Sequence, residues 1–195
     1  IKYPPGATPL NPDERNGLIP DYITTQGELN TLEQENILEA VAWATGKKKI
    51  DILNQGFAYD LHKRMFKRVW KWAGLPRQTE KNIGVPPEQI AVRLGQLFDN
   101  TKYWIENNTY PLDEVAVRFH HQLVSIHAFP NGNGRHARYM TNFLLERNGH
   151  APFTWGKHAG QTPIEVEGPK REEYIFALQE ADSKKFGRLL TFAKS

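Results

Sequence analysis

The chain has 195 residues, a net charge of +3, 39% hydrophobic residues and no cysteine. This length fits one ordinary domain with a buried core, and the mixed composition is typical of a globular protein. The lack of cysteine excludes disulfides and thiolate metal sites, and no apolar run approaches the length of a membrane helix. So mild a positive charge suits an anionic ligand but does not by itself indicate nucleic-acid binding. We therefore expect a cytoplasmic protein that binds neither membranes nor nucleic acid.

Residues 1–24 are rich in proline, glycine and asparagine without periodicity, which predicts an irregular N-terminal arm. The next four residues, Thr25 to Glu28, form a capping-box pattern, and the apolar residues that follow predict a helix over about 26–44. Between Asp51 and Trp72, apolar and aromatic residues again recur at helical spacing, with lysines and arginines between them. Such interleaving also occurs on faces that bind single-stranded nucleic acid or a membrane surface. Because the aromatics fall on the apolar stripe, the pattern favours packing in the core.

A proline at 76 ends that helix, and residues 77–87 predict a short hairpin whose second strand is 83–85. Two further helices are predicted, from Pro87 to Trp104 and from Pro111 to His127.

The C-terminal part begins with a Pro- and Gly-rich connection over 151–169, which predicts a small strand pair at 153–155 and 164–166. A helix over about 169–181 and a final turn or helix through Phe192 complete the chain.

Residues 127–138 read His-Ala-Phe-Pro-Asn-Gly-Asn-Gly-Arg-His-Ala-Arg and lie between two helical patterns. Glycines at 132 and 134 allow several backbone N–H groups to point at one place, and the next helix adds the positive end of its dipole. Arg135 and Arg138 are three residues apart and so share one helix face. This stretch therefore predicts a site for a di- or triphosphate.

Three histidines, His120, His121 and His127, raise the alternative of a zinc site. His120 and His127 are two helical turns, roughly 10 Å, apart instead of at the i, i+4 spacing of helical zinc pairs. No carboxylate or cysteine completes a ligand set, so we expect no zinc. His127 ends its helix directly before the glycine turn, where a neutral imidazole can reach a bound nucleotide and act as a general base.

The twelve residues fit His-x-Phe-x-x-Gly-Asn-Gly-Arg-x-x-Arg at all seven fixed positions, and this resembles the signature of the Fic family. The resemblance runs from about Thr25 to Phe192 but is strong only at 127–138. It implies a mainly α fold, a Fic-type helical bundle with a short β-hairpin flap, as a single Fic domain over 25–195. Pro130-Asn131 and His136-Ala137, on a chain this short, make it similar to the small bacterial Fic proteins called mobile mystery protein B.

By this resemblance, the protein is an adenylyltransferase that moves AMP from ATP to a Ser, Thr or Tyr hydroxyl of an unknown target protein. His127 would be the catalytic base, Phe129 the buried anchor of the motif, and Arg138 the partner of the γ-phosphate. The remaining phosphate ligands implied by the family are Gly132, Asn133, Gly134 and Arg135.

The resemblance also implies Mg²⁺ as a cofactor that accompanies ATP. Asn131 stands where active Fic enzymes usually carry Asp or Glu as a metal ligand. An amide oxygen is a ligand without charge, so Asn131 predicts a weakened Mg²⁺ site.

Residues 31–36 fit [Ser/Thr]-x-x-x-Glu-[Gly/Asn], the pattern of an inhibitory helix in Fic proteins. The resemblance implies that Thr31, Glu35 and Asn36 are regulatory, with Glu35 paired to Arg138 so that ATP cannot bind productively.

The predicted hairpin corresponds to the family's flap, which pairs with an extended segment of the target by backbone hydrogen bonds. The flap residues that would bind the target are Arg77, Thr79, Ile83 and Val85.

Two other classes of function fit the same residues. The site would equally suit removal of AMP, or transfer of another phosphate-containing group. The second class is a non-catalytic nucleotide-binding interaction module. The motif does not separate these alternatives from AMP transfer.

Overall fold

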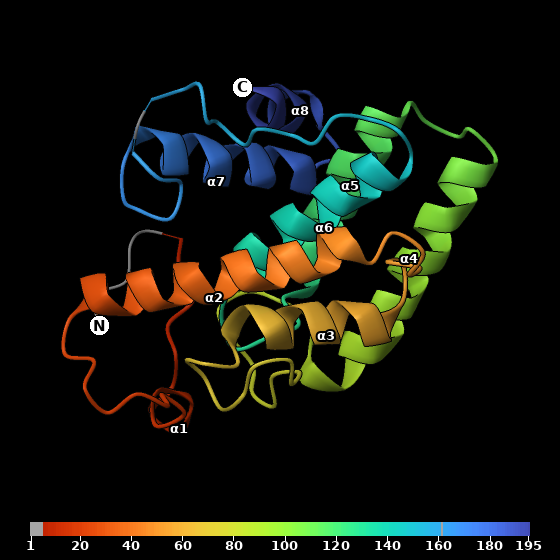
Figure 1. Ribbon diagram of the computed structural model, residues 1–195. Helices are drawn as coiled ribbons and strands as arrows, with labels where there is room; N and C mark the ends of the chain where they lie inside the picture. Colours follow the sequence, from red (N-terminus) through yellow and green to blue (C-terminus); the bar gives the residue numbers. More distant parts are fainter. Residues whose placement is uncertain (1–5, 161) are drawn as a thin grey trace.

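The computed structural model describes residues 6–160 and 162–195, and the chain is mainly α-helical, as the sequence predicts (Figure 1). The helices are α1 (Pro12–Arg15), α2 (Gln26–Gly46), α3 (Gln55–Phe66), the 3₁₀ helix η1 (Pro87–Gln89), α4 (Ile90–Glu106), α5 (Leu112–Ile126), α6 (Asn133–Arg147), α7 (Pro169–Asp182) and α8 (Gly187–Lys194). None of these helices is both long and apolar enough to cross a membrane.

Local capping sets where the helices begin. The Thr25 hydroxyl accepts from the Glu28 amide, and the Glu28 carboxylate accepts from the Thr25 amide at 2.9 Å, so α2 begins at the predicted capping box. The α3 helix is shorter than predicted. Asn54 caps the start of this helix by accepting from the Phe57 amide at 2.8 Å. The helix ends at Phe66. The residues beyond it pair with the N-terminal arm instead, since Leu18 and Trp70 form an antiparallel bridge.

The helices form two packed groups around the α5–α6 pair. The α2–α3 pair lies against α6, and α4 lies along α5, while α7 and α8 pack together beside α5 (Figure 1). The larger core fills the first group and contains Phe66, Phe98, Phe119 and Phe129. A second core under α7 and α8 is built around Trp155, Tyr174 and Phe192. The turn between α5 and α6 is therefore held from α3 on one side and faces α2 and α7 on the other.

No strand forms within residues 6–160 and 162–195, so both predicted strand pairs are wrong. Residues 77–86 form an irregular loop because the buried Arg77 guanidinium donates to the carbonyls of Thr79, Val85, Ile126 and His127. These bonds take the place of a ladder between hairpin strands. At 153–155 the amides of Thr154 and Trp155 both donate to the Ala193 carbonyl of α8, at 2.9 Å, instead of to residues 164–166.

Candidate functional site

His127 lies at the junction of α5 and the motif turn. It caps α5 in a left-handed conformation with φ 53°, and only 6% of its surface is exposed. Neither ring nitrogen has a hydrogen-bond partner among the described residues. Burial, together with the nearby charges of Arg77 and Lys81, lowers the pKa of His127 to about 4. The imidazole is therefore neutral at physiological pH, with a lone pair free to accept a proton.

The α6 helix begins six residues later, at Asn133, and its N-terminus is left without a side-chain cap in the described part of the chain. Its N-cap, Gly132, has φ +78°, and an added Cβ would come within 2.5 Å of the Phe66 ring, so only glycine fits. The amides of Asn133, Gly134 and Arg135 have no intrahelical acceptors, because the first turn of a helix offers none. They form a positive end that suits an anion.

Asn133 contributes to this site through its backbone, because its side chain holds the turn closed. Its Oδ1 accepts from the Phe129 amide at 2.9 Å, and its Nδ2 donates to the Phe129 carbonyl at 2.7 Å. The Phe129 ring is buried, as expected for an anchor, and stacks on His62 with ring centroids 3.7 Å apart. The turn is thus fixed in shape before any ligand binds.

Both motif arginines are paired with carboxylates. Arg135 Nη1 donates to Glu33 Oε2 at 2.6 Å, and the other carboxylate oxygen of Glu33 accepts from Trp70 Nε1 at 2.7 Å. Arg138 forms an ion pair with Glu165, which lies in the loop before α7. Each carboxylate therefore competes with a phosphate for the donors of its arginine.

The predicted pairing of Glu35 with Arg138 is wrong. Glu35 is exposed, and no ion pair joins it to another described side chain. Glu33 is buried with Leu29 and Ile37, which precede and follow it by four residues on the same face of α2. Two residues further on, Glu35 points roughly 200° away around the helix.

The other two residues of the predicted regulatory motif have structural roles. Thr31 Oγ1 donates to the Gly27 carbonyl within α2 at 3.0 Å. Asn36 is fully buried and joins α2 to the end of α3, where it donates to the Arg64 carbonyl and accepts from the Arg68 amide.

Asn131 does not fit a directly bound metal ion as it lies. Its Oδ1 accepts from the Gly132 amide at 2.7 Å and from Arg135 Nη2 at 3.4 Å, so a cation there would compete with a guanidinium. No group of three or more His, Asp or Glu side chains in the described residues could hold a metal ion. The side chains of this turn therefore offer Mg²⁺ little by themselves.

These groups surround one cavity of about 450 Å³. The cavity brings together the motif residues that are predicted to bind phosphate and the two carboxylates that hold the arginines, Glu33 and Glu165. The lining includes Thr8, Glu33, Ile83, His127, Asn131, Gly132, Asn133, Gly134, Arg135, Arg138, Glu165 and Tyr174. Thr31, Glu35 and Asn36 are not part of it.

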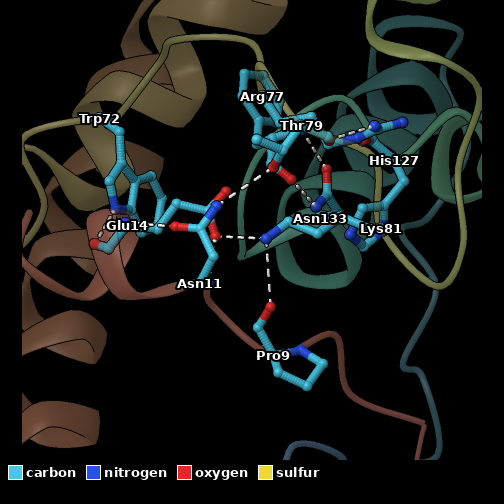
Figure 2. A network of polar contacts seen from close by, with 10 residues as sticks. Pro9, Asn11, Glu14, Trp72, Arg77, Thr79, Lys81, His127 and Asn133 are labelled. Carbon is cyan, nitrogen blue, oxygen red and sulfur yellow. Dashed lines mark hydrogen bonds and ion pairs between the residues drawn. The ribbon is translucent and has the colours of Figure 1, made fainter.

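Of the four predicted flap residues, Ile83 lines this cavity and is exposed, as a contact for a partner requires. Arg77 is only 1% exposed and cannot contact a target. Its Nε donates to the His127 carbonyl at 2.5 Å (Figure 2). Its backbone amide donates to the Ala128 carbonyl at 2.9 Å. Arg77 thus clamps the loop to the turn that carries His127. Thr79 is exposed and Val85 is half-buried, and both lie on this loop.

The model of the Fic/DOC family matches residues 52–145, which include the whole of this turn. The chain carries a Fic/DOC domain. The protein adenylyltransferase fic-1 of Caenorhabditis briggsae is 32% identical over 118 residues, which are 56% of this chain and 20% of that protein. The probable protein adenylyltransferase aq_aa38 of Aquifex aeolicus is 28% identical over 127 residues, which are 60% of this chain and 35% of that protein. The chain thus spans about a fifth to a third of the length of these relatives.

Solved Fic structures share the fold. The BepC protein of Bartonella tribocorum, solved with bound AMPPNP, superposes with a TM-score of 0.70 at 15% identity, covering 94% of this chain and 97% of that one. Fic-1 of C. elegans gives a TM-score of 0.62 at 22% identity, covering 92% of this chain and 50% of that one. At these identities the likeness concerns the fold.

Two buried histidines that support the Fic turn were not singled out from the sequence. The Gly74 amide donates to His62 Nδ1 at 2.9 Å, so His62 carries its proton on Nε2 and donates to the Asn131 carbonyl at 2.9 Å. His136 of the motif bonds the Ala58 carbonyl at 2.9 Å, and burial lowers its pKa to about 4. The only sequence signal for His62 is its place on the apolar stripe of α3, four residues before Phe66.

Proposed function

We propose that this Fic domain is a protein adenylyltransferase that transfers AMP from ATP to a hydroxyl of a target protein. One observation carries the proposal. An unpartnered, neutral His127 shares a cavity with the uncapped N-terminus of α6 and with both motif arginines. The names of the curated relatives and the AMPPNP bound to BepC support the same chemistry.

In the proposed reaction His127 takes the proton from a Ser, Thr or Tyr hydroxyl of the target. The hydroxyl oxygen attacks the α-phosphorus of ATP, the bond from that phosphorus to the bridging oxygen of the β-phosphate breaks, and pyrophosphate leaves. General-base catalysis of this kind typically contributes ~10²–10⁴ in rate.

The phosphates would lie at the start of α6, where the amides of Asn133, Gly134 and Arg135 offset the charge that develops in the transition state. Arg135 and Arg138 would hold the β- and γ-phosphates after release from their carboxylates. Mg²⁺, which neutralises the charge of the leaving pyrophosphate when bound, would be held by the phosphates and water, since Asn131 is already engaged.

We propose further that α2 restrains the site, through Glu33 and not through Glu35. The Glu33 side chain is nearly buried and is fixed at both oxygens, by Trp70 and by Arg135. A triphosphate that needs Arg135 must compete with this pair. The regulatory unit would be α2 within one Fic domain over residues 25–195.

The test is incubation of the chain with ATP labelled at the α-phosphate, and in parallel with ATP labelled at the γ-phosphate. AMP transfer predicts covalent label on protein from the α-labelled nucleotide only. Label from the γ-phosphate alone would indicate phosphoryl transfer instead. ATP binding without any covalent label would favour a nucleotide-binding module and contradict the proposed activity.

A further inference from the structure

Residues 6–19 of the N-terminal arm are an ordered part of the fold and lie at the candidate site. Its C-terminal half is anchored to the end of the α3 region, where the Ile19 amide donates to the Val69 carbonyl and the Lys71 amide to the Gly17 carbonyl, both at 2.8 Å. Leu10 is buried in the larger core. The arm therefore has a defined path over the surface.

Beyond this anchor, the arm binds the loop that precedes α4. Glu14 forms an ion pair with Lys81, and their side chains are only 11% and 6% exposed. Lys81 Nζ also donates to the Pro9 carbonyl at 3.3 Å, and Asn11 Nδ2 donates to Thr79 Oγ1 at 3.4 Å (Figure 2). Removing the Glu14 carboxylate while the arm stays bound would leave the nearly buried Lys81 charge uncompensated, which destabilises the bound arm.

The loop that holds the arm also holds the catalytic turn. Arg77 clamps it to the His127 carbonyl, and the Val85 amide donates to the Ile126 carbonyl at 3.3 Å. The Lys81 ammonium lies close enough to His127 to lower the pKa of the imidazole. A segment bound along Thr79 and Lys81 is therefore next to the proposed base.

The first residues of the arm then cross the cavity. Gly6, Ala7 and Thr8 line it together with His127 and Ile83. Gly6 lies against α7, since a Cβ added there would come within 3.0 Å of Ile175 Cδ1. The arm thus runs from the loop before α4 to α7 and places a threonine, nearly buried, in the lining of the cavity.

We propose that the arm occupies the place of the target segment, and that targets are protein segments with an acidic side chain for Lys81. This inference rests on the proposed function, in which the domain modifies a hydroxyl of a target protein. The arm has the features that such a segment needs: a hydroxyl residue at the cavity, an apolar anchor in Leu10, and a carboxylate in Glu14 that neutralises a nearly buried ammonium. A target must displace the arm and supply these groups itself.

Tethering makes the arm a strong competitor. A segment joined by a short linker has an effective concentration on the order of mM at its own site. Weakening the arm's contact should therefore improve binding of an external segment by tenfold or more. The gain should depend on the acidic group of that segment.

The probe is a fluorescent peptide with the sequence of residues 6–17, and its anisotropy is measured without nucleotide. Glu14→Gln protein should bind this peptide at least tenfold more tightly than the parent chain does. The matched control is Asp13→Asn, which removes the same charge from an exposed neighbour and should behave as the parent. A peptide with glutamine in place of its glutamate should bind the Glu14→Gln protein about tenfold more weakly than the parent peptide does.

Equal peptide binding by the parent, Asp13→Asn and Glu14→Gln proteins, each folded by circular dichroism, would overturn the proposal. So would equal binding of the glutamate and glutamine peptides. A double variant provides a second test in case the Glu14→Gln protein does not fold. The double variant Glu14→Lys with Lys81→Glu keeps an ion pair, and its peptide preference should change from glutamate to lysine; no change of preference would also overturn the proposal. Because no nucleotide is present, these results stand apart from any failure of AMP transfer.

Discussion

Glu33→Gln separates the regulatory role proposed for Glu33 from the role that the sequence motif implies for Glu35. The amide of glutamine can keep its oxygen on Trp70 Nε1 and would then turn an NH₂ group toward Arg135. Arg135 loses its anionic partner and becomes available to phosphate. Glu35→Gln removes the same charge from an exposed position of the same helix and serves as the matched control.

The size of the effect follows from the contact that is lost. Glu33 is 6% exposed, and its bond to Arg135 is short, at 2.6 Å. Hydrogen bonds to charged groups contribute about 1.5–3 kcal/mol, so ATP affinity should rise by about ten- to a hundred-fold. The loss of folding stability should be smaller, about 1 kcal/mol, because the Arg135 side chain is partly exposed and can be hydrated.

Calorimetric titration of the parent, Glu33→Gln and Glu35→Gln proteins with a non-hydrolysable ATP analogue measures this difference. We expect tighter binding for Glu33→Gln alone. A gain in Glu35→Gln with none in Glu33→Gln would refute the reasoning, since it would mean that α2 turns a different face toward the nucleotide.

Arg138 is restrained by Glu165, a more exposed carboxylate than Glu33. Glu165→Gln should therefore tighten ATP binding only a few-fold, since such pairs contribute about 1 kcal/mol or less. Unchanged affinity in the same titration would mean that Glu165 does not compete with phosphate. Asn131→Asp should lower the Mg²⁺ concentration that gives half-maximal α-phosphate labelling, because a carboxylate adds charge to the ligand oxygen. An unchanged requirement would mean that a side chain at position 131 does not reach the metal. Folding stability should fall as the pH is lowered from 6.5 to 5.5, because the unfolded chain gains protons that the folded chain excludes. The expected loss is about 1 kcal/mol for each imidazole whose pKa is lowered by burial. Urea unfolding at the two pH values measures this, and equal stabilities would contradict the buried, neutral state of His62, His120 and His136.

Much of the motif turn could be predicted from the sequence because its determinants are local. The φ of Gly132 and the end of α5 at His127 follow from a glycine-rich turn between two amphipathic helices. The start of α2 follows from the Thr25 capping box in the same way. Such features depend on residues within one or two turns of each other, so the chain order alone specifies them.

The contacts of α2 and of the loop before α4 depend on packing between distant segments. The rotation of α2 against α6 decides which of Glu33 and Glu35 faces the arginines, and a six-residue motif does not contain this information. The spacing of Leu29, Glu33 and Ile37 by four residues does place Glu33 on the apolar stripe. The hairpin prediction failed for a similar reason, since the buried Arg77 bonds carbonyls that lie up to 50 residues away in the chain.

The central claim is that His127 is the base for AMP transfer. His127→Asn tests it most directly, because asparagine tolerates the left-handed conformation at this position but cannot accept the proton as imidazole does. The variant is made in the Glu33→Gln background, and label from α-phosphate-labelled ATP is measured together with ATP affinity. We predict that labelling falls by at least a hundred-fold while ATP affinity is unchanged. Undiminished labelling in a folded His127→Asn protein would contradict the account.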